Sequence, residues 1–241
     1  MAPPSPLGRR PTVAALLGLT VVTGLVDAVS YLRLGRVFVA NMTGNVVFLG
    51  FSVDRHSGLS PVASLIAIGG FLAGALAGGR VAALLSSRPN RWLGVAIGSE
   101  AFLLALVAML AGTGVLPLSG RGDFATIVGL AVALGLQNST VRHFAVPDLT
   151  TTVLSLTLTG LAADSALVGG SGSRPHRRLG SVAAMLAGAA IGAGLLQLSP
   201  SGAIGLAAAL AGAVAVAFAT GRVANNPPTA EPSESAARGV R

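Results

Sequence analysis

Residues 24–50 read GLVDAVSYLRLGRVFVANMTGNVVFLG and set polar, helix-breaking residues inside an otherwise apolar chain. The first half of this stretch ends an apolar run that begins near residue 12. After Arg36 a second apolar run starts, and the polar stretch NMTGN (residues 41–45) interrupts it. A helix needs about 20 predominantly apolar residues to cross a bilayer. The second run is therefore either a short crossing or a segment that enters the membrane and turns back.

The composition of the whole chain requires a membrane environment. Of its 241 residues, 52% are apolar and only 10% are charged, and the mean hydropathy is +0.77. Soluble domains carry about 25% charged residues, so this chain cannot cover a soluble surface. The composition excludes a cytosolic enzyme, a nucleic-acid-binding domain and a disordered polypeptide. The absence of cysteine excludes disulfides and thiolate chemistry, and we expect no cofactor and no metal site.

Six apolar segments are long enough to span a bilayer, which predicts an all-α integral membrane protein. They cover residues 12–32, 61–85, 92–116, 123–141, 179–198 and 201–221. Two shorter runs, residues 37–53 and 144–160, are interpreted as re-entrant half-helices; the alternative is a chain with eight crossings. With six crossings, most arginines lie on the cytoplasmic side and the exceptions are Arg33, Arg36, Arg55 and Arg121. The positive-inside rule therefore favours six crossings.

The chain divides into three parts. Residues 1–11 are expected to form a cytoplasmic N-terminal segment, and residues 12–221 a polytopic membrane domain. Residues 222–241 are polar and contain proline, which predicts a disordered C-terminal tail, also cytoplasmic. Within the membrane domain, repeat A covers about 12–116 and repeat B about 123–221.

The two repeats share a weak but ordered pattern. Repeat A carries GLVD from Gly24, then NMTGN, and closes at Asp54; repeat B carries GLQN from Gly135, then DLTTT, and closes at Asp164. The first long helix after each copy has small residues four apart, a spacing that permits close helix packing; these are residues 70, 74 and 78, and residues 180, 184, 188 and 192. Because each repeat has three crossings, the second is predicted to be inverted, a 3+3 arrangement found in many transporters.

The same residues carry a resemblance to a known family. The stretch quoted above, together with GLQNSTVRHFAVPDLTTTVLSLTLTGLAAD (residues 135–164), resembles the YoaK-like family of bacterial integral membrane proteins of unknown function. The resemblance runs over about residues 12–221. It implies a multi-pass protein of the bacterial cytoplasmic (inner) membrane with about six helices. No activity comes with it, so it assigns no catalytic residue.

The interrupted segments are the first candidate sites. The apex of the first offers amide and hydroxyl groups from Asn41, Thr43, Gly44 and Asn45, and the second offers Asp148, Thr150, Thr151 and Thr152. Uncapped N–H groups at the start of a half-helix would attract an anionic or carbonyl-bearing solute. The alternative is local turn chemistry, in which Thr43 or Asn45 caps the half-helix.

Two carboxyl groups are predicted within membrane helices. Asp27 lies toward the outer end of the first helix, and Glu100 lies near the middle of the helix over residues 92–116. A carboxylate at the helix centre costs at least about 2.5 kcal/mol on insertion scales and usually faces a partner or a water-filled cavity. We predict a role in proton or ion coupling for both. The alternatives are an Asp27 pair with Arg33 or Arg36, and a neutral Glu100 hydrogen-bonded across helices.

Gln137 and Asn138 align with Val26 and Asp27 in the repeat and are predicted to be interior polar residues. The pair Ser139 and His143, four residues apart, is the weak signal for an intramembrane enzyme. The sequence thus favours a small-solute transporter or channel. The alternatives are a non-transporting scaffold or accessory protein and, less favoured, an intramembrane enzyme. Its expected partners are the lipid bilayer and an unidentified small solute or proton, with self-association into a homo-oligomer left open.

Overall fold

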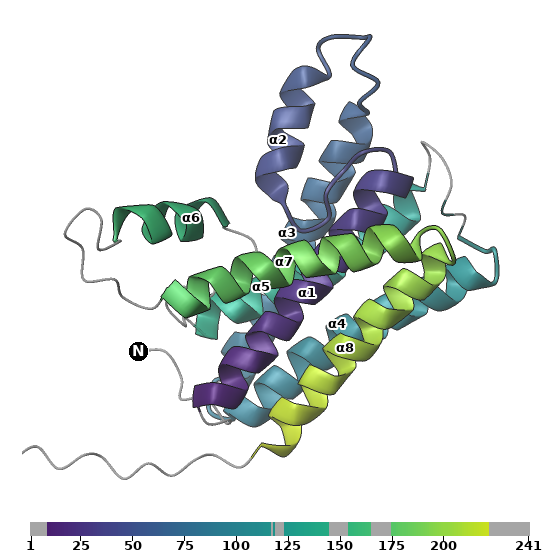
Figure 1. Ribbon diagram of the computed structural model, residues 1–241. Coiled ribbons are helices and arrows are strands. Elements are labelled where there is room, and N and C mark those ends of the chain that lie inside the picture. The colour runs from purple at the N-terminus through teal and green to yellow at the C-terminus, as the bar shows by residue number, and fades with distance from the viewer. Residues whose placement is uncertain (1–8, 117, 119–122, 145–153, 165–174, 222–241) are drawn as a thin grey trace, which may run out of the picture.

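The computed structural model describes residues 9–116, 118, 123–144, 154–164 and 175–221, and within them the chain forms eight α-helices and no β-strand (Figure 1). The helices are α1 (Arg9–Arg33), α2 (Met42–Phe51), α3 (Pro61–Leu85), α4 (Pro89–Gly112), α5 (Phe124–Phe144), α6 (Leu154–Ala163), α7 (Pro175–Leu195) and α8 (Pro200–Thr220). The predicted second apex, Asp148–Thr152, the tail over 222–241 and residues 1–8 of the N-terminal segment lie outside the described residues.

Helix lengths confirm the predicted fold class. Six of the described helices are long and apolar enough to cross a membrane. The other two, α2 and α6, have 10 residues each, which corresponds to about 15 Å of rise. Because a bilayer core is about 30 Å thick, neither short helix can span it. The chain is therefore an all-helical, multi-pass membrane protein with six membrane-length helices and two short ones.

Proline positions explain where several helices begin. Pro61, Pro89, Pro175 and Pro200 each open a helix, because the first helical position needs no N–H donor and favours the fixed φ of proline. At α3 and α8 a serine precedes the proline and caps the helix. These caps are the Ser60 hydroxyl, which accepts from the Ala63 N–H at 3.2 Å, and the Ser199 hydroxyl, which accepts from the Gly202 N–H at 3.0 Å. The predicted spans that began at the first apolar residue therefore start up to one turn too late.

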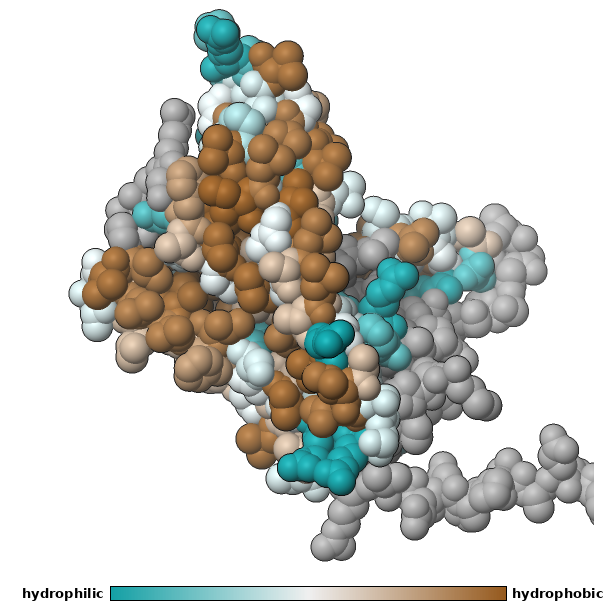
Figure 2. All heavy atoms as spheres, turned by 180° about the vertical axis from the view of Figure 1, so that it is seen from behind, coloured by the Kyte–Doolittle hydropathy of each residue, from teal (hydrophilic) through white to brown (hydrophobic). Residues whose placement is uncertain are grey.

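Large and small side chains are distributed as expected for a protein in lipid. On α3 the large residues Leu65, Leu72, Leu76 and Leu84 are exposed, whereas the buried positions are mostly alanine and glycine. A soluble protein would bury its leucines, but in lipid they lose nothing by facing outward. Figure 2 shows apolar side chains over most of one face, with hydrophilic residues at its top and bottom and in a group at mid-height beside the grey atoms.

Small residues let two pairs of helices pack with their backbones in contact. A Cβ added to Gly74 on α3 would collide with the carbonyl oxygen of Val132 on α5. In the second half, a Cβ added to Gly188 on α7 would collide with the carbonyl oxygen of Val21 on α1. Both glycines belong to the small-residue faces expected from the sequence. Such close approach stabilises membrane helix pairs through van der Waals contact.

The partner helices carry glycines at the same interfaces. A Cβ added to Gly24 on α1 would lie 2.5 Å from the carbonyl oxygen of Met185, and one added to Gly135 on α5 would collide with that of Phe71. Gly24 and Gly135 open the two copies of the repeat in the sequence. Equivalent positions of the two copies therefore make equivalent contacts.

The same correspondence holds for the whole set of packed helices. The two repeats match α1 with α5, α2 with α6, α3 with α7 and α4 with α8. Under this match, the contacting pairs α1–α7, α1–α8, α2–α3 and α3–α4 correspond to the pairs α3–α5, α4–α5, α6–α7 and α7–α8. The remaining pairs, α1–α5 and α4–α8, join counterparts to each other. Exchanging every helix of the first half with its counterpart in the second leaves this set unchanged. The architecture is thus compatible with the predicted two-fold repeat.

The order of contacts along paired helices gives their relative directions. Gly180 and Gly192 of α7 lie beside Leu17 and Leu25 of α1, so these two helices run parallel. Helices α3 and α5 also run parallel. The contacts that establish this are Gly70 with Val128 and Gly78 with Leu136.

Helices α4 and α8 run antiparallel, because Gly94 lies beside Ala219 whereas Gly112 lies beside Ser201. Helices α1 and α8 are antiparallel as well. Gly18 lies beside Val214 of α8, and Arg33 at the end of α1 bonds to Leu196, which lies just before α8 begins. A short connection between α3 and α4 makes those two helices antiparallel, so α1, α4 and α7 run one way and α3, α5 and α8 run the other.

These directions exclude the eight-crossing alternative. If α2 and α6 crossed the membrane, crossings would alternate along the chain and α4 and α8 would run parallel. They run antiparallel, so neither short helix reverses the side on which the chain continues. The described helices therefore agree with six crossings, three in each half, and with counterpart helices α4 and α8 of opposite direction.

Candidate functional site

Residues 34–41 connect α1 to the short helix α2, and the irregular second part of this connection, residues 37–41, forms a linker. Its peptide N–H groups lie outside any helix and need other acceptors. The carboxylate of Asp27 supplies one: its Oδ1 accepts hydrogen bonds from the N–H groups of Val39 and Ala40, both at 3.0 Å. Asp27 is only 4% exposed. The predicted carboxyl group of α1 therefore binds the linker backbone immediately before the first apex.

Asn45 holds the same linker from α2. Its Oδ1 accepts a hydrogen bond from the N–H of Phe38 at 2.9 Å, and its Nδ2 donates to the carbonyl oxygen of Phe38 at 2.5 Å. The side chain is fully buried. The expectation that Asn45 caps α2 is wrong, because its oxygen binds the linker backbone and not an N–H group of the helix.

The start of α2 is left without a side-chain cap. Asn41 occupies the capping position, but its side chain accepts no hydrogen bond from the described first turn. The Gly44 N–H bonds to the Asn41 carbonyl oxygen at 3.1 Å, and Thr43 is exposed. Gly44 lies against Phe38, since an added Cβ would be 2.6 Å from the ring carbon Cδ2. Glycine is therefore required here by the position of an aromatic ring.

Three aromatic rings fasten the linker to both helices. The Tyr31 and Phe38 rings are stacked, with centroids 5.0 Å apart and planes 18° apart. Phe48 of α2 completes the cluster at 5.6 Å from Phe38 and 6.0 Å from Tyr31. Aromatic pairs contribute about 0.5–1.5 kcal/mol beyond their area burial. The cluster therefore adds rigidity to the linker, whose Phe38, Val39 and Ala40 N–H groups bond to side chains and not to a helix backbone.

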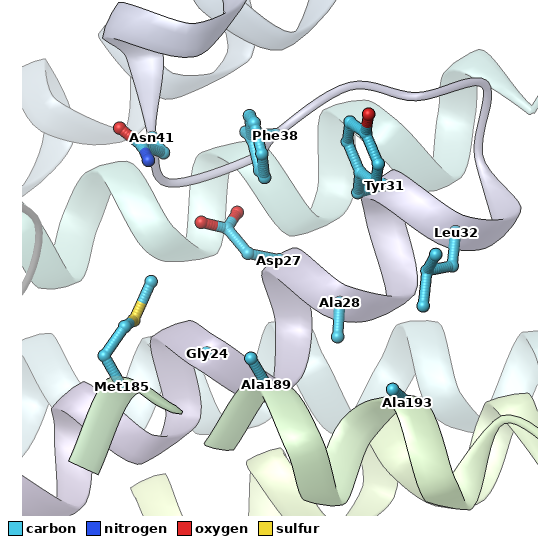
Figure 3. Close-up of a pocket in the computed structure, with 10 residues that line it drawn as sticks. All are labelled: Gly24, Asp27, Ala28, Tyr31, Leu32, Phe38, Asn41, Met185, Ala189 and Ala193. Atoms are coloured by element: carbon cyan, nitrogen blue, oxygen red, sulfur yellow. The ribbon is translucent and has the colours of Figure 1, made fainter. Parts of the chain in front are cut away.

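A cavity of about 310 Å³ lies between the linker, α1 and α7. Figure 3 shows Asp27 pointing from α1 toward the linker, between Phe38 and Asn41, with Met185 and Ala189 of α7 across from it. The remaining lining residues are Gly24, Ala28, Tyr31, Leu32 and Ala193. The Asp27 Oδ2 is buried and has no hydrogen-bond partner among the described residues. One polar acceptor thus lies at the wall of a mostly apolar cavity.

A second cavity, of about 430 Å³, adjoins the first and shares Tyr31 and Leu32 with it. Its other lining residues are Arg33, Gly35, Arg36, His56, Ser57 and Gly58. The Arg33 Nη2 donates to the carbonyl oxygen of Leu196 at 3.0 Å, at the end of α7. The described ion pairs do not include one from Asp27 to either arginine. Its bonds go to backbone N–H groups.

Glu100 lies in a different part of the fold. It is fully buried on α4, and neither carboxyl oxygen has a hydrogen-bond partner in the described part of the chain. Val107, two turns further along α4, contacts Gly129 of α5. Because α4 and α5 run antiparallel, Glu100 lies at the level of Leu136 and Gln137. The structure does not bring Glu100 to the first apex.

Gln137 joins α5 to α1 at this level. Its Nε2 donates to the Thr23 hydroxyl at 2.8 Å and to the Leu19 carbonyl oxygen at 3.4 Å, and the side chain is fully buried. Its Oε1 has no partner among the described residues. Asn138, the counterpart of Asp27, donates to the Leu134 carbonyl oxygen of its own helix at 2.9 Å.

The structure describes only some of the other predicted site residues. Asp148, Thr150, Thr151 and Thr152 lie outside the described residues. Past them, Asp164 at the end of α6 forms an ion pair with Arg178 of α7 at 2.6 Å. The counterpart Asp54 lies in the turn after α2 and is exposed.

The Ser139–His143 pair lacks the geometry of a nucleophile and its base. The Ser139 hydroxyl donates to the Leu136 carbonyl oxygen at 3.0 Å, and the His143 Nδ1 contacts the Ser139 carbonyl oxygen at 2.8 Å. The imidazole therefore does not contact the hydroxyl it would have to activate. Among the described residues, no three histidine or acidic side chains cluster to hold a metal ion.

Sequence reasoning missed most of the cavity wall. Phe38 and the α7 residues Met185, Ala189 and Ala193 carry no polar group that could point to a site, and the Tyr31 hydroxyl belongs to no predicted motif. The only pointer was the row of small residues on α7, which predicts that this helix approaches another closely. Thr23 was also missed as the partner of Gln137, because a threonine within an apolar helix usually bonds its own backbone, as Thr23 also does.

Comparisons with known proteins confirm the predicted resemblance. The family model described as "Protein of unknown function (DUF1275)" matches residues 15–217. The UPF0700 transmembrane protein YoaK of Bacillus subtilis (strain 168) is 32% identical over 164 residues, which cover 64% of this chain and 67% of that protein. No solved structure matches the chain. Because the family model covers most of its length, this chain belongs to the DUF1275 family of proteins of unknown function.

Proposed function

We propose that this protein is a small-solute transporter or channel of the bacterial cytoplasmic membrane. The observation that supports the proposal is the first apex: an unwound linker next to a helix of half-membrane length, with a buried carboxylate at a cavity. Non-helical backbone at membrane depth is tolerated where it is buried in protein or lines a cavity. Inverted repeats with such interrupted segments place the solute site near the midplane.

In this proposal the two halves form an inverted 3+3 repeat. The packed pairs and opposite directions of α4 and α8 support it. The apex Asn41–Asn45 and its sequence counterpart Asp148–Thr152 would then approach the midplane from opposite sides. Arginine distribution supports cytoplasmic N- and C-termini.

The carboxyl groups have distinct parts in the proposal. Asp27 contacts the solute or a coupled ion at the cavity. Glu100, with Gln137 at the same level, relays a proton in the middle of the bundle, where α1, α4 and α5 meet; Asn138 occupies the position of Asp27 in the second half. Glu100 and Gln137 both carry buried acceptors without a partner among the described residues, and a carboxyl group in such a setting supports a role in proton transfer.

One observation favours the scaffold alternative. Both polar atoms of the Asn45 side chain bond to the linker backbone, so this residue has no free group for a solute. If every apex residue were used in this way, the apex would only join helices. The free Oδ2 of Asp27 and the cavity beside it distinguish the transporter proposal from this alternative.

Reconstitution into liposomes tests the proposal. Stopped-flow light scattering would follow the entry of glycerol, methylammonium and formate into vesicles with and without the protein. We expect at least one solute to enter about tenfold faster than into empty vesicles. The variant Asp27→Asn should remove this increase, and Asp54→Asn, at an exposed carboxylate, should retain it. Folded protein that speeds none of a wider set of solutes would contradict a transport function.

A further inference from the structure

The cavity beside the linker is lined by mostly apolar residues and by Asp27, whose buried Oδ2 is an unsatisfied acceptor among the described residues. Asp27 Oδ1 is engaged by the Val39 and Ala40 N–H groups, whereas Oδ2 is buried without a partner among the described residues. A buried carboxylate without a counter-charge is costly and usually has a cationic partner. The residues lining this cavity include no arginine or histidine, and the chain has no lysine. Among the described residues, none that lines this cavity carries a positive charge, so a cationic ligand would supply the missing counter-charge.

A metal ion does not fit the available ligands. Na⁺, Ca²⁺ and Mg²⁺ sites are built from several oxygen ligands, about six or more for the divalent ions. Here the lining side chains offer few oxygens beyond Asp27: the Asn41 amide and the Tyr31 hydroxyl. A protonated amine requires only one strong acceptor for an N–H group. The donor set thus favours an ammonium group over a metal ion.

The rest of the wall suits an apolar substituent on that ammonium group. Ala28, Leu32 and the α7 residues Met185, Ala189 and Ala193 present aliphatic surface, and Phe38 adds an aromatic ring. Pockets for small ligands are mostly apolar with a few placed polar groups. The cavity of about 310 Å³ corresponds to about ten water molecules at liquid volume. A short alkylammonium ion fits both the volume and the wall.

We infer that this cavity binds a small primary organic cation, with its N–H donating to Oδ2 of Asp27 and its alkyl group against α7. The inference rests on the proposed transport function, for which it names the substrate class. In the bound state Oδ1 keeps its two linker hydrogen bonds. The same carboxylate thus positions the apex with one oxygen and recognises the cation with the other.

Binding to the purified full-length protein in detergent tests this inference directly. Isothermal titration calorimetry with butylammonium should show saturable binding. An excess of Na⁺ at matched ionic strength should not compete, and tetramethylammonium, which has no N–H donor, should bind at least tenfold more weakly. Equal competition by Na⁺ or by tetramethylammonium would overturn the assignment.

Two variants separate recognition from folding. Asp27→Asn keeps an oxygen for the linker but replaces the free acceptor with an N–H donor, so we expect butylammonium affinity to fall at least tenfold. Asp54→Asn, in the exposed turn after α2, should bind like the wild type. If Asp27→Asn does not fold, Ala189→Leu provides the second test, because it fills the cavity and should also abolish binding. Wild-type affinity in either folded variant would overturn the inference.

The binding and flux measurements test the cation assignment and the transport function independently. If butylammonium does not bind but another solute still crosses vesicles that contain the protein, the cation assignment is wrong and the transport function stands. If butylammonium binds through Asp27 but no solute crosses, the cation site stands and the transport function is wrong.

Discussion

Asp27 on α1 and Asn45 on α2 bind successive peptide groups of one linker: Asn45 engages both sides of Phe38, and Asp27 accepts from the next two N–H groups. Together they replace the hydrogen bonds that a helix would have provided across this break. Two polar side chains from flanking helices thus make an unwound segment tolerable in an apolar setting.

Removing the Asp27 acceptor should destabilise the fold strongly. Asp27→Ala leaves two N–H groups without a partner, which costs about 2–6 kcal/mol at 1–3 kcal/mol per buried unsatisfied group. Asp27→Asn retains a neutral acceptor and should cost about 1–2 kcal/mol. Thermal unfolding in detergent should rank the wild type above Asn and Asn above Ala. An Ala variant as stable as the Asn variant would show that the linker does not depend on this oxygen.

Neither removal of the Asn45 amide nor its replacement by a carboxyl group should preserve the stability of the protein. Asn45→Ala leaves the Phe38 N–H and carbonyl group unpaired, a cost of about 2–6 kcal/mol. Asn45→Asp can accept from the N–H but places a second oxygen against the Phe38 carbonyl, so it should not restore stability. Thr43→Ala, at an exposed neighbouring position, should change stability by at most about 0.5 kcal/mol. The unfolding temperatures of the three variants provide the check.

The close helix contacts predict equal effects in the two halves. Gly74→Ala and Gly188→Ala each force a Cβ into a backbone carbonyl and should destabilise by at least about 1–3 kcal/mol. Gly69→Ala has open space around it and should be neutral or stabilising by up to about 1 kcal/mol. The fraction of protein that stays monodisperse after heating measures this. A large effect in one half alone would argue against equivalent packing.

Helix directions predict which turns share a side of the membrane. The chain has no cysteine, so single cysteines can be introduced without background at Ser57, Ser87 and Ser199. In intact cells, a membrane-impermeant maleimide should label Ser57→Cys and Ser199→Cys but not Ser87→Cys. Labelling of Ser87→Cys alone would reverse the orientation, and labelling of Ser57→Cys and Ser87→Cys together would contradict a crossing by α3.

We expect Glu100 to lower the unfolding free energy of the protein and to contribute to solute flux. Neither carboxyl oxygen has a hydrogen-bond partner in the described residues. Replacing the carboxyl group with an apolar side chain of similar size therefore removes the free-energy cost of burying polar atoms that make no hydrogen bond. Glu100→Leu should raise the unfolding free energy by about 1–3 kcal/mol and reduce solute flux in vesicles. Leu104→Met, one turn away on the same helix, should change neither quantity much. Full flux in Glu100→Leu would remove this residue from the transport proposal.

Much of the architecture could be predicted from the sequence because membrane insertion acts on local properties. Segment length and hydropathy suffice to identify six membrane-length helices, and the polar stretch after Ala40 marks the break before α2. The predicted helix boundaries were less accurate, since α7 begins at Pro175 and not at residue 179. The small-residue rows on α3 and α7 also predicted close packing, since only small side chains permit it.

Which groups meet was decided by the tertiary structure alone. Asp27 lines a cavity that residues of α7 complete, more than 150 positions later in the chain, and Gln137 reaches back to Thr23. Such contacts depend on how helices cross, which no local pattern specifies. The sequence by itself therefore determined what spans the membrane and where it breaks, because hydrophobicity and turn chemistry are local. Packing geometry determined that Asp27, and not an arginine or a cap, holds the break, because a buried carboxylate bonds whatever N–H groups the fold brings to it.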